Sequence, residues 1–221
     1  MASRNGGEFM RSEIKEMLDK TCELFNIIDE KTGIMEKAGA SGQLCNILKY
    51  ELTAFLMCLS AADGRISRVE AKLLRDYFEI EFYPIHIKET IKENGIGSKE
   101  YYKKVPECLR LAVKFDNYMV KHDHKVEKGI SEIVLELFRV LGKEMVIADE
   151  KVTMEEQLAW GKYITLMTQY IVDKSKLYQQ KPDAVARPGT PIEVDYEMSL
   201  DKIGRIYTIY VGRFSDIGDC H

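Results

Sequence analysis

Apolar side chains recur at helical spacing along most of the chain. In residues 11–31 they fall at every third or fourth position, which is the pattern of an amphipathic helix. Residues 43–62 are apolar around almost their whole circumference, so we expect this helix to be central. Further helices are predicted at residues 67–82, 84–93, 98–104, 106–122, 128–147 and 153–178. The pattern predicts an all-α helical bundle.

The helical pattern stops after residue 180. Three prolines fall within ten residues and exclude a helix there: Pro182, Pro188 and Pro191. Residues 192–196 and 203–214 are short, aromatic and β-branched, so they could pair as a β-hairpin or dock as an extended arm. Because a single hairpin is marginal alone, we expect this tail to need the helical body or a partner chain.

The chain therefore divides into three parts. Residues 1–10 are polar, Gly-rich and without period, and we take them as a disordered or cloning-derived start outside the fold. Residues 11–180 form the predicted helical domain. Residues 181–221 form a Pro-rich linker and a C-terminal arm.

Composition narrows the class of protein. The formal net charge of −4 and the absence of a basic stripe interleaved with aromatics argue against nucleic-acid binding. No stretch of 18 apolar residues and no signal-peptide core is present, so we expect a soluble, cytoplasmic chain without a membrane span. The chain has five cysteines, an odd number, and no CxxC pair. This pattern favours reduced thiols over a framework of disulfides. The cysteines are Cys22, Cys45, Cys58, Cys108 and Cys220.

A nine-residue motif occurs twice, each time between an apolar helix and an amphipathic one. Each copy has an Asp, then Ser or Thr four residues later, then Glu seven residues after the Asp. The first copy holds Asp63, Ser67 and Glu70, and the second holds Asp149, Thr153 and Glu156. Ser or Thr followed by Glu three residues later is a capping box, which opens a helix. Two well-formed helix starts are therefore one complete interpretation of the motif.

A cation site is the alternative interpretation. Carboxylate oxygens are ligands suited to Ca²⁺ or Mg²⁺. If the two copies pack about a pseudo-twofold axis, Asp63, Glu70, Asp149 and Glu156 could converge on one face. An EF-hand is not complete in either copy, because its first and third ligand positions hold apolar residues. These are Leu59 and Ala61 in the first copy, and Met145 and Ile147 in the second.

The segments LMCLSAADGRISRVEAKLL and LGKEMVIADEKVTMEEQLAW resemble the TerB-like (tellurite-resistance TerB) family. The resemblance covers residues 43–169 and implies an all-α bundle of two related helix-turn-helix halves. It also implies a stress-response or phage-resistance setting, often near membrane-associated complexes, and a metal-binding centre at the four acidic residues. The second copy lacks the motif glycine, and residues 84–105 are a long insertion. These departures leave tellurite resistance itself without support.

Other candidate chemistry is weak. His122 and His124 could bind a transition metal with Asp123 or Glu127. Residues two apart on a helix point to different faces, however, which favours a solvated helix end. Asp116 is interpreted as an ordinary polar-face residue, and Trp160 as a core anchor. No phosphate-binding loop, GxSxG elbow or HExxH motif is present.

The sequence favours a non-enzymatic helical module that binds a protein partner and could bind a divalent cation. The partner could meet the C-terminal arm, where Tyr207, Tyr210 and Phe214 could face a groove. A metal-dependent hydrolase that uses the acidic cluster and a purely structural bundle are the alternatives. The sequence leaves the partner and the oligomeric state open.

Overall fold

Helices account for all the regular structure in the described part of this computed structural model. Residues 4–39, 41–80, 83–96, 101–122, 129–148 and 151–179 are described. The α-helices are α1 (Arg4–Thr32), α2 (Ile34–Lys37), α3 (Leu44–Ser60), α4 (Arg68–Phe78), α5 (Pro84–Glu93), α6 (Glu107–His122), α7 (Ile130–Val146), α8 (Met154–Lys174) and α9 (Lys176–Gln179), with a 3-10 helix η1 at Tyr101–Lys103. The predicted all-α bundle is confirmed.

Three helix boundaries differ from the prediction by four residues or more. α1 begins at Arg4 rather than at residue 11, since a stable helix can propagate one residue at a time into a poor sequence. α4 ends at Phe78, because Glu79 adopts a left-handed conformation with φ of 58°. The predicted helix over residues 153–178 breaks at Ser175. There Asn117 accepts from the Lys176 N–H at 2.6 Å and donates to the Lys174 carbonyl at 2.9 Å, so the backbone can leave the helix.

α3 is the central helix, as its pattern predicted. It packs against α1, α4, α5, α6, α7 and α8. The ring of Phe55 lies 5.2 Å from that of Phe138 on α7 and stacks on Tyr163 of α8 at 5.0 Å. Gly142 allows this close approach, because a Cβ there would lie 2.6 Å from Trp160 and 3.0 Å from Phe55. Aromatic packing therefore joins the two halves of the chain.

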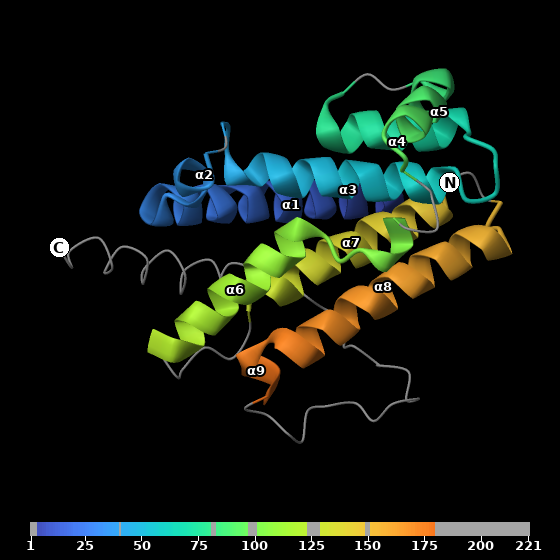
Figure 1. Cartoon of the computed structure of the whole chain (residues 1–221). Helices are drawn as coiled ribbons and strands as arrows, with labels where there is room; N and C mark the ends of the chain where they lie inside the picture. Colours follow the sequence, from blue (N-terminus) through green and yellow to red (C-terminus); the bar gives the residue numbers. More distant parts are fainter. Residues whose placement is uncertain are drawn as a thin grey trace.

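The long helices give the bundle two distinct ends (Figure 1). α1 runs antiparallel to α3, and α7 runs parallel to α3. Contacts agree with this view: Arg11, near the start of α1, forms an ion pair with Glu144, near the end of α7, at 3.8 Å. The C-terminal ends of α3 and α7 therefore lie at the same end of the bundle.

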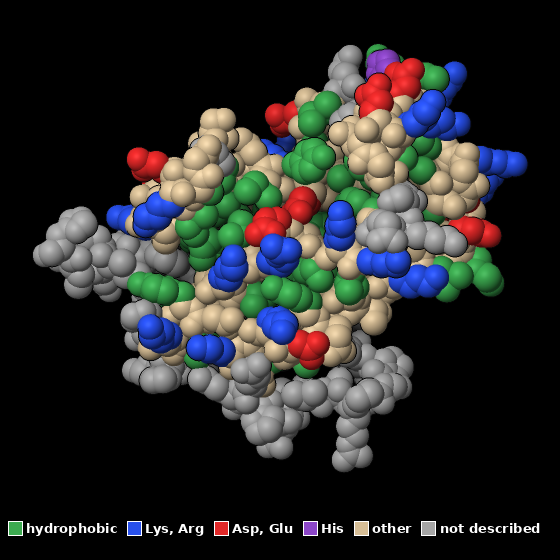
Figure 2. All heavy atoms as spheres, viewed as in Figure 1, with side chains coloured by type: hydrophobic (Ala, Val, Ile, Leu, Met, Phe, Trp, Pro, Cys, Tyr) green, Lys and Arg blue, Asp and Glu red, His purple; other side chains and the backbone are tan. Residues whose placement is uncertain are grey.

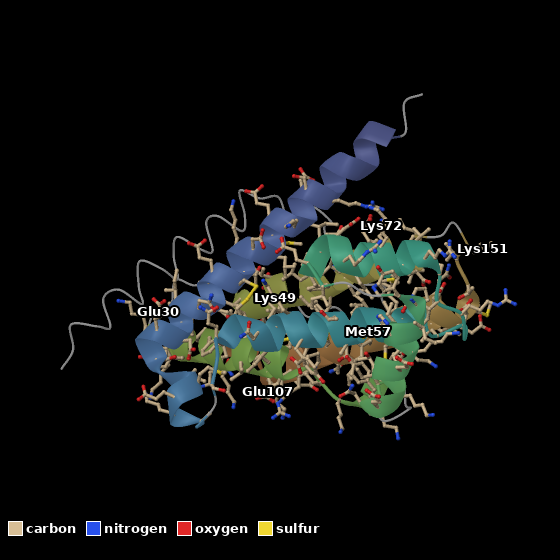
Figure 3. The ribbon with its side chains drawn as sticks, turned by 90° about the horizontal axis from the view of Figure 1, so that it is seen from above. Glu30, Lys49, Met57, Lys72, Glu107 and Lys151 are labelled. Atoms are coloured by element: carbon tan, nitrogen blue, oxygen red, sulfur yellow. A yellow bond between two sulfur atoms is a disulfide. The ribbon has the colours of Figure 1, made fainter. Side chains whose placement is uncertain are left out.

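Cys22 and Cys45 form a disulfide between α1 and α3 (Figure 3), with Cα atoms 4.8 Å apart. The prediction that the cysteines are all reduced is wrong for this pair. Sequence spacing could not reveal it, because the two residues meet only when α1 folds back on α3. Cys58 and Cys108 are free and buried, as expected of small core residues.

Some predicted features lie outside the described residues. These are the β-hairpin or extended arm at residues 192–196 and 203–214, the linker, Cys220, and the Asp123 and His124 positions. In the part that is described, no helix combines the length and apolar character that a membrane span needs.

Candidate functional site

The first motif forms a tight corner between α3 and α4. After α3 ends, the N–H of Ala62 donates to the Leu59 carbonyl at 3.0 Å. Gly64 takes φ of 81°, a value that a residue with a side chain rarely adopts. Ser67 then caps α4: its hydroxyl accepts from the Glu70 N–H at 3.1 Å, and Glu70 accepts from the Ser67 N–H at 2.6 Å. The predicted capping box is confirmed.

The second motif forms an equivalent corner between α7 and α8. The N–H of Ala148 donates to the Met145 carbonyl at 3.2 Å, as at the corresponding position of the first corner. Thr153 and Glu156 form the second capping box, with hydrogen bonds of 3.3 Å and 3.1 Å. Asp149 and Glu150 lie outside the described residues.

The two corners belong to equivalent helix pairs. α3 and α7 each have 17 residues, and each is followed at the same spacing by its capped helix. Both corners lie at the same end of the bundle (Figure 1). In Figure 3, Lys151 of the second corner and Lys72 of α4 lie away from Glu30, which marks the other end. The pairs α3–α4 and α7–α8 therefore share one arrangement, in which a 17-residue helix leads through a corner to a capped helix.

The three candidate ligands that are described, Asp63, Glu70 and Glu156, already accept local hydrogen bonds. Glu70 is 3% exposed and Glu156 is 5% exposed, and both carboxylates accept from their cap residues. Asp63 is half-buried and accepts from the Arg65 N–H at 2.7 Å. In the ranges that are described, no group of three or more His, Cys, Asp or Glu is placed to hold a metal ion. Convergence of the four predicted ligands stays a prediction, because Asp149 is not described.

An apolar rim lies beside the second corner. Met154 is 73% exposed and Leu158 is 52% exposed, and four residues apart on α8 they are neighbours on one helix face. Ile147 and Val152, in the corner itself, are also exposed. We call these four residues the corner rim. Exposed apolar neighbours on one helix face, such as Met154 and Leu158, mark surfaces that contact other molecules.

Trp160 lies behind the rim. It is half-buried against the core, as predicted, and its indole N–H is buried without a hydrogen-bond partner. The same ring closes over Gly142 of α7. This tryptophan therefore packs the first turns of α8, which carry Met154 and Leu158, against α7.

Two carboxylates, the buried Asp116 and the half-buried Glu51, cap helices from a distance, and the sequence did not predict either cap. Asp116 accepts from the N–H groups of Ile130 and Ser131 at the start of α7, at 2.8 and 3.1 Å. The view of Asp116 as an ordinary polar-face residue is wrong, because it is 0% exposed. Glu51 of α3 likewise accepts from Glu107 N–H and Cys108 N–H at the start of α6, at 2.6 and 2.7 Å.

The side chains of Cys108, Tyr101 and Tyr163 are poorly suited to catalysis. Burial raises the pKa of the Cys108 thiol well above its ordinary value, so this sulfur stays protonated and weakly nucleophilic. Burial also raises the pKa of Tyr101 and of Tyr163, whose rings stack at 5.8 Å. These side chains are neutral packing groups rather than acids or bases poised near neutral pH.

Comparison of the chain with protein-family models, with curated proteins and with solved structures gives no match.

Proposed function

We propose that this chain is a non-enzymatic helical module that binds a protein partner at the corner rim. The proposal rests on the exposure of Met154 and Leu158 at the start of α8, a helix whose next turns are buried in the core. Met and Leu side chains offer apolar area to a partner, and the flexible Met side chain adapts its shape to the surface that it meets. A partner helix or loop with apolar anchors would cover them.

Membership of the TerB-like family is part of the proposal. It is supported by the two corners, in each of which an apolar helix is followed at the same spacing by a helix that opens with a capping box. A stress-response or phage-resistance setting follows from that resemblance alone. A Ca²⁺ or Mg²⁺ ion at the corners is not needed for the partner site, because Glu70 and Glu156 stabilise their helix starts without one.

A hydrolase is the weaker candidate. Metal-assisted hydrolysis needs carboxylates that face an ion with open coordination positions. Glu70 and Glu156 instead face backbone N–H groups and are buried. The geometry of these two side chains therefore supports a structural role.

Partner capture with matched surface variants tests the proposal. The wild-type chain is used as bait in an extract of the cells that produce it, and the captured proteins are quantified. We expect Met154→Glu/Leu158→Glu to lose a partner that the wild type retains. Ile85→Glu is the control, since Ile85 is equally exposed but lies on α5. Equal capture by all three proteins, with matching circular-dichroism melts, would show that the corner rim binds nothing.

A further inference from the structure

A basic stripe runs along the outer face of α6. Arg110, Lys114 and Lys121 are exposed, and their spacing of four and seven residues places them on one face of the helix. The residues between them that face inward are buried, and all of them except Asp116 are apolar. The outer face of α6 therefore carries positive charge on a chain whose net charge is −4.

The end of α8 and the start of α9 add two more cations to this face. Asn117, between Lys114 and Lys121 in sequence, bonds the backbone of Lys174 and of Lys176 at 2.9 and 2.6 Å. Both lysine side chains are exposed. We call Arg110, Lys114, Lys121, Lys174 and Lys176 together the α6 basic stripe. In Figure 2, Lys and Arg side chains are spread over the face that α6 and α8 present.

Most of this charge has no acidic partner in the described part of the chain. Arg110 forms an ion pair with Glu107 at 2.8 Å. The ion pairs found among the described residues include none of the four lysines of the stripe. Asp173 is the nearby acidic residue, and it accepts from Gln169 at 2.8 Å. The stripe can therefore attract an anionic segment.

The same chain carries a segment of opposite charge. Residues 192–201, IEVDYEMSLD, alternate apolar and polar positions without a break. Their four acidic residues are Glu193, Asp195, Glu197 and Asp201, with no Lys or Arg. In an extended chain, alternate side chains point to opposite sides, so all four carboxylates would share one side. The acidic side would span roughly 26 Å, at about 3.3 Å per residue.

The chain leaves the described structure close to the stripe. The last described residue, Gln179, belongs to α9, which packs against α6. Residues 180–191 can bridge up to about 40 Å when extended, whereas α6 is about 24 Å long at 1.5 Å per residue. The acidic segment can therefore reach every position along α6.

We propose that residues 192–201 dock as an extended segment along the α6 basic stripe of their own chain. The carboxylates of the segment face the lysines, and its apolar side faces away from α6. The contact is electrostatic, so it weakens as salt screens the charges. This use of the tail is independent of the partner site at the corner rim.

Zero-length carbodiimide cross-linking of the full chain, read by mass spectrometry, tests the docking. At low salt we expect cross-links within one chain between Lys114, Lys121, Lys174 or Lys176 and the acidic residues of the segment. In Lys114→Glu/Lys121→Glu, the cross-links from the remaining amines of Lys174 and Lys176 should fall roughly tenfold, because attraction becomes repulsion at two positions. Lys88→Glu/Lys92→Glu, the same charge change on exposed positions of α5, should leave the yield unchanged.

A charge swap completes the test. Adding Glu193→Lys and Asp195→Lys to the Lys114→Glu/Lys121→Glu variant should restore cross-links between the segment and the helix. Three outcomes would overturn the proposal: cross-links of the segment to other surfaces, cross-links only between two copies in an isotope-mixing experiment, or an equal loss in the α5 control.

Discussion

The carboxylate of Asp116 occupies the space that a side chain at Gly129 would need. A Cβ at Gly129 would lie only 2.6 Å from Asp116 Oδ1 and closer to the other carboxyl atoms. This contact lets Asp116, on α6, accept from the first N–H groups of α7. A helix that begins at glycine, without a capping side chain of its own, therefore takes its cap from a neighbouring helix.

Gly129→Ala tests this relationship. We expect it to lower the free energy of unfolding by about 2 kcal/mol, because the added methyl group displaces a buried carboxylate. Asp116→Ala should cost about 3 kcal/mol, since two N–H groups lose their acceptor. The double variant should cost less than the sum, because both changes act on one contact. Urea unfolding measures all three, and full additivity would argue against the shared contact.

The disulfide gives a second prediction. A cross-link that closes a loop of this length (sequence separation 23) stabilises a fold by about 3 kcal/mol. For a chain of this size, reduction should therefore lower Tm by roughly 10 °C. Thermal melts with and without a reducing agent measure the shift. Cys22→Ala/Cys45→Ala should melt at the same temperature in both conditions. A wild-type Tm that the reducing agent leaves unchanged would contradict the disulfide between Cys22 and Cys45.

The buried tyrosines predict how the fold responds to alkali. Burial raises the pKa of Tyr101 and of Tyr163 above the ordinary value, so these phenols keep their protons in the folded chain. Above about pH 10 the unfolded chain releases those protons, so the stability that they contribute is lost as the pH rises. Tyrosinate absorbance should therefore show a step that coincides with loss of helical circular dichroism. Complete ionisation of the tyrosines in a chain that is still helical would contradict their burial.

Cation binding can be tested through stability. A cation at a hundred times its Kd would stabilise the fold by about 2.7 kcal/mol. Because the Glu70 and Glu156 carboxylates already accept from backbone N–H groups, we expect Ca²⁺, Mg²⁺ and a chelator to give the same Tm. A rise in Tm with either ion that disappears in Asp63→Asn/Asp149→Asn would instead support the site predicted from the sequence.

Local rules predicted the helices and their starts well. Residues 43–62 were predicted as a central helix, and α3 spans Leu44–Ser60. Both capping boxes follow from two residue types three positions apart, a spacing that the chain itself fixes. The equivalent corners were predicted for the same reason.

Features that depend on a neighbouring helix were not predicted. Asp116 and Glu51 cap helices that begin 14 and 56 residues away in sequence. Cys22 and Cys45 meet only after α1 packs against α3. The break at Ser175 depends on Asn117 of α6. In each case the deciding partner lies far along the chain, where periodicity carries no information.

The corner rim was also beyond sequence reasoning. Met154 and Leu158 fall within a helix that was correctly predicted, but their exposure depends on which side of α8 packs against α7. The packing of Trp160, Tyr163 and Met167 against the core fixes that side. The proposed partner site therefore rests on tertiary structure.

Photo-cross-linking shows directly whether the corner rim contacts a protein partner. A photoreactive amino acid is placed at Leu158, or at Ile85 as the control, in the cells that produce the chain. We expect a protein adduct from position 158 that Met154→Glu abolishes, and no such adduct from position 85. No adduct from position 158, or the same adduct from both positions, would contradict it.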